Sequence, residues 1–387
     1  MTQVHGKVEP GYEKVRDAFA QNFEDKGEVG AGFCLYVDGR PVVDIWGGVA
    51  DASTGREWTE DTLQLVFSTT KGAAAMCAHV LVDRGELDLD APVAKYWPEF
   101  AASGKEQVPV RMLLNHQAGL PAVDKKLSQE EILQVGPVVD ALAEQAPFWK
   151  PGSQHGYHAL TYGWLVGEIV RRVSGRSLGQ FLRDEIADPL GLDLWIGLPA
   201  EHESRVAPLL NAPPATDPAQ IQQMMAVMGP GTLGGRALSM DGAFLLAGEE
   251  ENAFNTRAVH ASEMPAANGI TTAASLARMY AASIGEVDGV RLFGDDTLAS
   301  ARAEQSRGAD ACLVVNTRFG LGFMLNDDEI PLLGDGSFGH AGAGGSLGFA
   351  DPESGVAFGY VMNQMGAGLL IDERPARLIE VLRETLR

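Results

Sequence analysis

The sequence predicts an α+β fold in which the two ends of the chain share one antiparallel sheet flanked by terminal helices, while the middle forms an inserted, mainly helical lobe. A hairpin pattern near each end predicts the sheet, and helical periodicity between them predicts the lobe. We expect residues 1–66 and 285–387 to form the α/β domain and residues 67–284 the helical domain. The cleft between the lobes is the expected functional site.

The N-terminal elements are an amphipathic helix and a hairpin. Residues 11–25 place apolar side chains at roughly helical spacing, which predicts a helix lying on a sheet. The apolar runs 33–37 and 42–47 flank Asp38-Gly39-Arg40, where Gly39 can adopt the positive φ that a tight hairpin turn requires. We therefore predict two paired strands directly after the first helix.

The middle of the chain is predicted to be helical. Residues 160–173 repeat apolar side chains on one face, and Gly175 follows as a stop signal. A second helix is expected from Ser177, with Gln180 three residues later as a capping-box signal, to just before Pro189. Residues 211–268 instead have weak periodicity and are rich in Pro, Gly, Ala and Met, which is typical of a functional lid or a disordered insert.

The C-terminal elements repeat the pattern of the N-terminal ones. Residues 348–350 and 356–362 flank the turn sequence Asp351-Pro352-Glu353-Ser354-Gly355, which predicts a second hairpin. A closing helix follows, with apolar residues on one face at Leu378, Val381, Leu382 and Leu386.

Composition restricts the class of protein and its partners. Of 387 residues, 45% are apolar and 21% are charged, which is ordinary for a globular protein. The 52 acidic and 30 basic residues give a net charge of -22, which would repel nucleic acids and anionic membranes. The three cysteines are widely spaced, and neither a secretory pattern nor a membrane-spanning run is evident. We therefore expect reduced core thiols and a cytoplasmic protein.

The strongest chemical signal is Ser68-Thr69-Thr70-Lys71. Lys71 is the only formal charge between residues 65 and 82, a run that predicts a buried helix beginning at about Ser68. The two side chains would lie one turn apart on one face, with Cβ atoms about 5–6 Å from each other. Burial and the helix dipole would lower the lysine pKa and make it a base for the hydroxyl, and free N–H groups at the helix start suit an oxyanion. The alternative is that Ser68 only caps a core helix while Lys71 reaches solvent.

Two further stretches support a catalytic interpretation. Residues 151–159 form a turn before the helix near Leu160, from which the Tyr157 phenol could point into the cleft. The alternative is a surface aromatic residue. Residues 339–345 are small and precede the C-terminal hairpin, so substrate could approach the backbone closely there. The alternative is a flexible turn.

Three motifs in this order resemble those of the serine β-lactamase-like hydrolases, and more closely the family VIII carboxylesterases. They are Ser68-Thr69-Thr70-Lys71, Tyr157-His158-Ala159 and His340-Ala341-Gly342, and residues 113–121 and 161–168 are also similar. The resemblance covers nearly the whole chain and implies a β-lactamase/transpeptidase-like fold of the class C type. It implies Ser68 as nucleophile, Lys71 as base and Tyr157 as a second proton-transfer group. It also implies an oxyanion hole from the N–H groups of Ser68 and Ala343, and substrate contacts from His340, Gly342 and His158.

One departure from the β-lactamase pattern bears on the substrate. His340 stands where β-lactamases and penicillin-binding proteins carry the lysine of Lys-Thr-Gly, and a histidine with an ordinary pKa of about 6.5 is mostly neutral at pH 7. A fixed charge for a substrate carboxylate is then missing, which favours uncharged esters. Weak cephalosporin turnover stays compatible with the same acylation groups.

We therefore expect a serine carboxylesterase that hydrolyses or transacylates small carboxylic esters of short to medium chain length. The methionines between Met224 and Met240 are expected to wall the acyl pocket because thioethers adapt to varied chains. The rival hypotheses are a β-lactamase or D-alanyl-D-alanine peptidase, and a non-catalytic scaffold that self-associates. No cofactor, metal, nucleic acid or membrane partner is expected, and a homo-oligomer stays open.

Two other patterns are weaker candidates. Gly344-Gly345-Ser346-Leu347-Gly348 matches the nucleophile elbow of α/β-hydrolases, but that triad needs a histidine after the serine and none follows Ser346. The glycines are instead expected to serve the strand edge beside the cleft. His155 and His158 lack a third ligand at zinc-like spacing, and His116 is expected to be a hydrogen-bonded structural residue.

Overall fold

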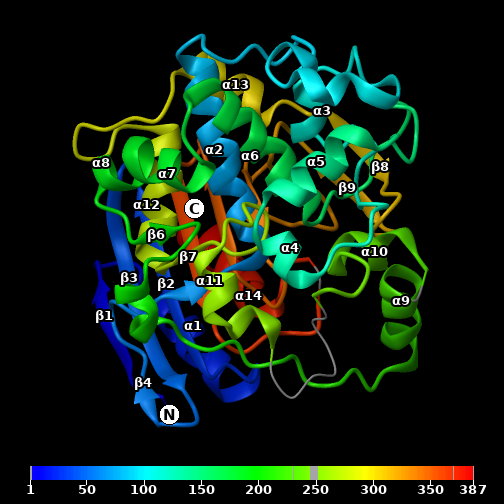
Figure 1. The fold of residues 1–387 in the computed structure, drawn as a ribbon. Coiled ribbons are helices and arrows are strands. Elements are labelled where there is room, and N and C mark those ends of the chain that lie inside the picture. The colour runs from blue at the N-terminus through cyan, green and yellow to red at the C-terminus, as the bar shows by residue number, and fades with distance from the viewer. Residues whose placement is uncertain (1, 230, 245–251, 369, 387) are drawn as a thin grey trace.

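A computed structural model describes residues 2–229, 231–244, 252–368 and 370–386 (Figure 1). The strands within these ranges are β1 (Val4–Val8), β2 (Gly30–Val37), β3 (Arg40–Asp51), β4 (Arg56–Glu57), β5 (Gln64–Leu65), β6 (Leu194–Trp195), β7 (Ile270–Thr271), β8 (Ser306–Ala309), β9 (Asn316–Phe319), β10 (Met324–Leu325), β11 (Phe338–Ala341), β12 (Leu347–Asp351) and β13 (Val356–Met362). The α-helices are α1 (Glu13–Asp25), α2 (Thr70–Asp83), α3 (Arg111–Leu114), α4 (Gln129–Leu133), α5 (Gly136–Glu144), α6 (Thr161–Ser174), α7 (Leu178–Leu182), α8 (Asp188–Leu190), α9 (Pro218–Met228), α10 (Leu233–Ser239), α11 (Arg257–Ala261), α12 (Ala273–Ile284), α13 (Asp295–Arg302) and α14 (Glu373–Thr385).

One antiparallel sheet joins the two ends of the chain. Its strand order is β1-β3-β2-β13-β12-β11-β10-β9-β8, with β4 added to β3. The N-terminal hairpin meets the C-terminal hairpin where β2 pairs with β13, in a register that sets Phe33 opposite Tyr360 and Leu35 opposite Phe358. The α+β fold and the joining of the two ends are therefore confirmed. A second, small sheet has the order β5-β7-β6.

Alternation along the strands separates two apolar layers. Phe33 and Leu35 pack in the cluster that holds the buried faces of α1 and α14, whereas Cys34 and Tyr36 pack in the cluster that holds α12 and α2. The predicted terminal helices thus cover one face of the sheet. Helix α12 covers the other face, with the backbone of Ala273 directly against Gly359 of β13. This packing places α12 with the sheet, so we propose that the boundary between the domains lies before residue 273 rather than at 284.

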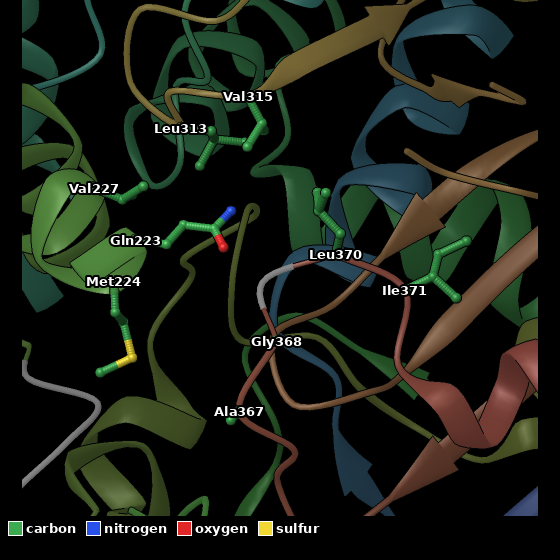
Figure 2. A pocket seen from close by; sticks show the side chains of 9 residues that line it. All are labelled: Gln223, Met224, Val227, Leu313, Val315, Ala367, Gly368, Leu370 and Ile371. Atoms are coloured by element: carbon green, nitrogen blue, oxygen red, sulfur yellow. The ribbon is translucent and has the colours of Figure 1, made fainter. Parts of the chain in front are cut away.

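The stretch 211–268 contains more regular structure than its composition predicts. Helices α9 and α10 lie to one side of the sheet and the helical lobe (Figure 1). Asp217 and Thr232 cap their N-termini by accepting hydrogen bonds from Ala219 and Gly235. A pocket of about 230 Å³ lies between α9, the loop at Leu313 and Val315, and residues 367, 368, 370 and 371 (Figure 2). Residues 230 and 245–251 of the stretch fall outside the described residues.

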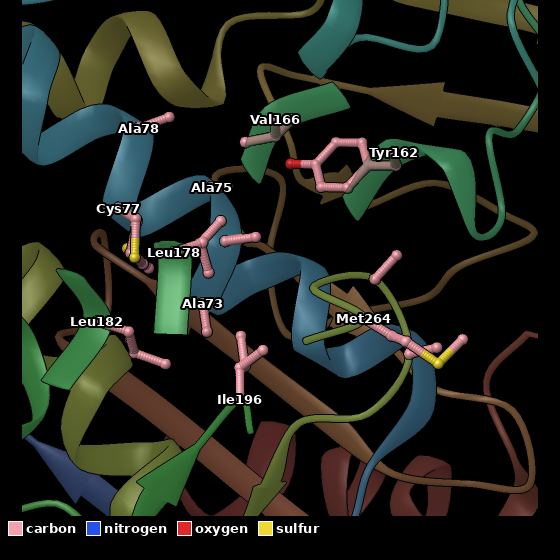
Figure 3. Packing of buried hydrophobic residues seen from close by; sticks show 14 of the residues in the cluster. Ala73, Ala75, Cys77, Ala78, Tyr162, Val166, Leu178, Leu182, Ile196 and Met264 are labelled. Atoms are coloured by element: carbon pink, nitrogen blue, oxygen red, sulfur yellow. The ribbon is translucent and has the colours of Figure 1, made fainter. Parts of the chain in front are cut away.

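Helix α2 is buried all round. Its residues Ala73, Ala74, Ala75, Met76 and Cys77 are each at most 2% exposed. Small side chains let neighbouring helices approach closely, and Figure 3 shows α2 beside Tyr162 and Val166 of α6 and Leu178 and Leu182 of α7. The predicted buried helix is therefore present, preceded by a 3₁₀ turn at Phe67–Thr69.

Several local predictions can be compared directly with the structure. Helix α6 ends at Gly175, which has a φ of 75° as its stop signal requires. Ser177 caps α7, but α7 ends at Leu182 and further helical turns continue past Pro189, which occupies the first turn of α8. The three cysteines are buried and unpaired. None of the described helices has the length and hydropathy needed to cross a membrane.

Candidate active site

The Ser68 hydroxyl is presented by a strained turn. Phe67, the preceding residue, has a φ of 43°, an unfavourable backbone conformation for a side chain of this size. Its ring packs edge-on against Phe254 with centroids 4.8 Å apart, and this contact helps to hold the turn. Ser68 itself is only partly buried, in contrast to its neighbours Phe67 and Thr69.

Lys71 lies one turn beyond Ser68, and its side chain is fully buried. Its Nζ is 3.2 Å from Ser68 Oγ and donates to the carbonyl oxygens of Ala159 (2.6 Å) and Ala266 (3.1 Å). A neutral amine has two N–H donors and one lone pair. Because the two carbonyls can only accept, they can occupy both donors, and the lone pair then faces the Ser68 hydroxyl.

Burial sets the protonation states of Lys71 and Tyr157. Loss of water lowers the pKa of Lys71 well below its ordinary value of 10.5. Burial raises the pKa of Tyr157, and an interaction with the Ser68 side chain only partly offsets this. Lys71 Nζ lies 4.7 Å from the centroid of the Tyr157 ring. The site thus combines a lysine that loses its proton readily with a phenol that keeps its proton.

The loop that carries Tyr157 is fixed by a carboxylate that the sequence analysis missed. Asp310 is 3% exposed, and its Oδ1 accepts hydrogen bonds from the N–H groups of Tyr157 (3.0 Å), Cys312 (2.8 Å) and Leu313 (2.9 Å). The local pattern at 310–313 is that of an Asx turn, which the sequence could have indicated. Its bond to Tyr157 spans 153 positions, and no local pattern predicts such a contact.

His158 and His116 hold backbone rather than substrate. His158 Nδ1 bonds the Gly156 carbonyl at 2.7 Å, and its Nε2 accepts from the N–H of Leu120 at 2.9 Å. Burial lowers the pKa of His158 to about 3, so the ring is neutral. Both ring nitrogens therefore have backbone partners, and the proposed function assigns His158 no contact with substrate. His116 is buried and accepts from the His158 N–H, as expected of a structural histidine.

The turn between β11 and β12 carries Ala343, the predicted second oxyanion donor. Among the described residues the Ala343 N–H donates no hydrogen bond, so it is available to a ligand. Ser346 fastens this turn to the Ser68 turn: its Oγ donates to the Val66 carbonyl at 2.8 Å and lies 3.1 Å from Thr69 Oγ1. The serine of the rejected nucleophile-elbow motif therefore joins the turns on which the two candidate oxyanion donors lie.

The His340 ring lies close to Tyr157, whereas Gly342 lies in the tightly packed turn that follows β11. His340 is 1% exposed and its ring centroid is 6.0 Å from that of Tyr157. Its Nδ1 bonds the Ala341 carbonyl, whereas its Nε2 has no partner among the described residues. Burial and the proximity of Lys71 lower its pKa to about 3. Close packing requires a glycine at position 342, because a Cβ there would lie 2.2 Å from both Ser346 Oγ and the Val66 carbonyl.

The described residues contain no group of histidines, cysteines and carboxylates that could hold a metal ion. His155, the other member of the histidine pair, bonds Thr317 Oγ1 at 2.9 Å through Nε2. This bond therefore also helps to fix the loop that carries Tyr157.

A sheet built from both chain ends, with a serine, a lysine and a tyrosine meeting beside an inserted helical lobe, defines the class of β-lactamase-like serine hydrolases. The chain belongs to the Beta-lactamase family, whose model matches residues 15–382. It is 36% identical over 379 residues to the esterase/beta-lactamase LipL of Mycobacterium tuberculosis (strain ATCC 25618 / H37Rv), covering 96% of this chain and 85% of LipL.

Solved structures agree with this assignment. A crystal structure of a family VIII carboxylesterase superimposes with a TM-score of 0.88 and 38% identity, covering 99% of this chain and 100% of the other. A penicillin-binding protein homologue from Caulobacter crescentus gives a TM-score of 0.86 and 38% identity over 99% and 100% of the two chains. The protein is thus a hydrolase of the family VIII carboxylesterase type.

Proposed function

We propose that the protein is a serine carboxylesterase that forms an acyl-enzyme on Ser68. It hydrolyses small carboxylic esters with short to medium acyl chains, or transfers their acyl group to another alcohol. The observation that supports this best is the position of the Lys71 amine, buried between two carbonyl acceptors with its third direction toward Ser68 Oγ. A hydroxyl becomes nucleophilic when a neighbouring base takes its proton.

Acylation uses all three side chains. As Ser68 Oγ bonds to the ester carbonyl carbon, Lys71 Nζ takes the hydroxyl proton and the carbonyl π electrons move to oxygen. The N–H groups of Ser68 and Ala343 stabilise that oxyanion. When the intermediate collapses, the ester C–O bond breaks and the leaving alcohol oxygen receives the proton from Lys71 through the Tyr157 hydroxyl.

Deacylation repeats these steps with water. Water gives a proton to the Lys71 and Tyr157 pair and attacks the acyl carbon. The bond from that carbon to Ser68 Oγ breaks, and Oγ recovers the proton. The products are a carboxylic acid and free enzyme. When an alcohol attacks the acyl-enzyme in place of water, the product is a new ester, and the reaction is the proposed transacylation.

The apolar pocket in Figure 2 is the proposed acyl site. Its walls are connected to the reacting groups. Leu313 is held by Asp310, which also holds Tyr157. Gly366, which precedes the lining residue Ala367, donates to the Gly344 carbonyl next to Ala343. An apolar cavity of about 150 Å³ can hold benzene, so about 230 Å³ suits a medium acyl chain. Met224 is among its lining residues, which supports the proposed acyl site.

The direct test of the function compares wild type with Ser68→Ala on p-nitrophenyl acetate and butyrate. We expect turnover only by the wild type, and covalent labelling of wild type at Ser68 by a fluorophosphonate probe. Equal rates for the two proteins, or no labelling at Ser68, would support the non-catalytic scaffold instead.

The pocket is tested with Met224→Ala and the matched control Met225→Ala. Met224 lines the pocket, whereas the adjacent Met225 is 56% exposed. Each buried methylene contributes about 0.8 kcal/mol, or about fourfold in kcat/KM, until the pocket is full. We expect Met224→Ala alone to shift the optimum across acetate, butyrate, hexanoate and octanoate esters toward longer chains. An unchanged optimum would remove the acyl assignment of this pocket.

A second candidate activity is slow β-lactam hydrolysis, which the name of LipL, an esterase/beta-lactamase, favours. The buried, neutral His340 provides no positive charge for the carboxylate of a β-lactam. Loss of one charge-assisted hydrogen bond costs about 1.5–3 kcal/mol, so we expect nitrocefin to be at least about tenfold worse in kcat/KM than the best ester. A higher kcat/KM for nitrocefin would make a β-lactamase the better assignment.

A further inference from the structure

Arg374, at the first turn of α14, is a buried cation that the proposed chemistry does not use. Its side chain is 3% exposed. The guanidinium has five N–H donors in a rigid planar arrangement, and the structure provides five acceptors for them. The acceptors are Asp372 Oδ1 for Nε, Glu28 Oε1 and the Gln364 carbonyl for Nη1, and the Gly344 carbonyl and Asp372 Oδ2 for Nη2.

One of these five contacts reaches the turn that carries Ala343. Arg374 Nη2 donates to the Gly344 carbonyl at 2.7 Å, and the N–H of Gly366 donates to the same oxygen at 2.8 Å. Gly344 follows Ala343 directly. The Gly344 carbonyl is therefore held by two donors, one of them charged, in addition to the bonds by which Ser346 joins this turn to the Ser68 turn.

The glycines of this turn make room for the guanidinium. Gly345 has a φ of 130°, and a Cβ there would lie 2.9 Å from Arg374 Nη2. Gly344 has a φ of 84°, and a Cβ there would lie 2.8 Å from Met365. The sequence pattern that resembles a nucleophile elbow is thus explained by the close approach of Arg374 and the segment that holds it.

The charge of Arg374 is balanced away from the substrate. Glu28 is fully buried, lies 3.0 Å from Nη1 and also accepts a hydrogen bond from the Tyr360 hydroxyl of β13. Asp372 supplies the second carboxylate and caps α14 by accepting from the Arg374 N–H. The guanidinium is therefore fixed by Glu28 beside the sheet, by Asp372 at the helix start and by the Gln364 carbonyl together.

We propose that Arg374 is a positioning residue for the oxyanion hole: through the Gly344 carbonyl, and together with the Ser346 attachment, it holds the Ala343 N–H in the direction of the developing oxyanion. This inference rests on the proposed esterase function. It gives Arg374 no contact with substrate. A misplacement of about 1 Å at a reacting centre can cost about 10²-fold in rate, so the accuracy of this support affects kcat.

The test uses Arg374→Lys, Arg374→Gln and the double variant Glu28→Gln/Arg374→Met. The double variant removes both buried partners, which is tolerated better than leaving one charge unpaired. Arg377→Gln is the matched control. Arg377 lies on the same helix and forms a bidentate pair with Asp25 of α1, with two contacts of 2.8 Å, but it does not contact the turn.

The concentration of active sites is first measured by titration with a fluorophosphonate. This distinguishes a variant that folds poorly from one that folds but has a lower kcat. Per titrated site, we expect kcat for p-nitrophenyl butyrate to fall about 10- to 100-fold in the Arg374 variants, with KM within about twofold. The Ki of an alkyl boronic acid, which forms a tetrahedral adduct on the nucleophile, should rise by the same factor as kcat/KM falls. Lysine is not expected to rescue, because a single ammonium cannot reproduce five fixed donors.

Two results would overturn the inference. The first is an unchanged kcat per titrated site in the variants that fold, with only the titratable fraction reduced. The second is an equal fall in Arg377→Gln. A wild-type enzyme without ester turnover would instead refute the proposed function, so the two failures are distinguishable.

Discussion

At the scale of single residues, the ionisation of Lys71 is the property on which catalysis depends. Only the unprotonated amine can take the Ser68 proton, and burial lowers the pKa of Lys71. We therefore expect kcat/KM to rise with pH through this lowered pKa and to reach a plateau at a pH well below 10.5. A pH-rate profile of ester hydrolysis measures this rise, which is the ascending limb of the profile. Lys71→Ala should lower kcat by about 10²–10⁴-fold and remove the limb.

The ionisation of other buried groups can be distinguished from the ascending limb that is assigned to Lys71. The pKa values of His158 and His340 are lowered to about 3, so neither ring titrates in the relevant range. Burial raises the pKa of Glu28 to about 7, against the effect of Arg374. Glu28→Gln is therefore the control, and the limb should persist in it. A limb that follows Glu28 rather than Lys71, or one in the ordinary lysine range, contradicts the role given to Lys71.

Tyr157 and Tyr162 provide a matched pair for the second proton-transfer step. Both hydroxyls are buried without a hydrogen-bond partner among the described residues, and both rings lie near Lys71 Nζ, at 4.7 Å and 5.8 Å. The Ser68 side chain opposes the burial-induced rise in the pKa of Tyr157, whereas the Tyr162 hydroxyl lies against Gly322. We expect Tyr157→Phe to lower kcat about 10²–10⁴-fold and Tyr162→Phe to leave it nearly unchanged.

Thermal unfolding completes this comparison. Neither substitution removes a hydrogen bond that the described residues make, so Tm should change little in either variant. If Tyr162→Phe lowers kcat as much as Tyr157→Phe does, the phenol at 157 has no special part in proton transfer.

At the scale of elements, the start of α2 depends on a glycine. A Cβ on Gly72 would lie 2.1 Å from the Tyr280 hydroxyl, and the same ring also lies close to Gly348 of β12, where a Cβ would be 2.6 Å from it. The Tyr280 ring is fully buried among these neighbours. Gly72→Ala should therefore destabilise the protein by about 1–3 kcal/mol and displace the neighbouring Lys71, with loss of ester turnover.

The same clash predicts a rescue. Tyr280→Phe in the Gly72→Ala background removes the overlapping oxygen, so Tm and turnover should both recover in large part. Gly136→Ala is the control, because nothing lies within 4 Å of a Cβ at that helical glycine. It should be neutral or stabilising by up to about 1 kcal/mol. If the double variant is no better than Gly72→Ala, then contact with the Tyr280 hydroxyl is not the cause.

Elements with local signals were predictable, and those fixed by distant contacts were not. Helices α1, α6 and α14 and both hairpins follow from periodicity and turn residues. The strands β1 and β8–β10 escaped detection because they are short or rich in polar residues and glycine, and they exist because the sheet pairs them. Helices α9 and α10 were missed because weak periodicity concealed adequate caps.

The candidate site shows the same division. The spacing of Ser68 and Lys71 indicated their contact because one helical turn joins them. The roles of Asp310, Ser346 and Arg374 depend on bonds across 153, 280 and 30 positions, for which a single sequence gives no signal. Conversely, His158 looked suitable for substrate because its two backbone partners could not be seen in the sequence.

At the scale of the whole molecule, the net charge of -22 acts on substrates before they reach Ser68. A strongly acidic protein repels anionic ligands over roughly a Debye length, which is about 30 Å at 0.01 M salt and about 3 Å at 1 M. The neutral His340 adds no compensating cation at the site. Anionic esters should therefore be selected against by the field of the whole protein as well as by the apolar pocket.

Salt separates these two causes of discrimination. p-Nitrophenyl butyrate and p-nitrophenyl hemisuccinate carry acyl chains of equal length, but only the second is anionic at pH 7. We expect kcat/KM for butyrate to be nearly independent of ionic strength, and kcat/KM for hemisuccinate to be lower at low salt and to rise as salt is added.

The hemisuccinate carboxylate can attack its own ester, so the rate with Ser68→Ala is subtracted as background. A ratio that does not change with salt would assign the discrimination to loss of water in the pocket alone. A faster hemisuccinate reaction at low salt would mean that a local cation at the site outweighs the field of the acidic surface.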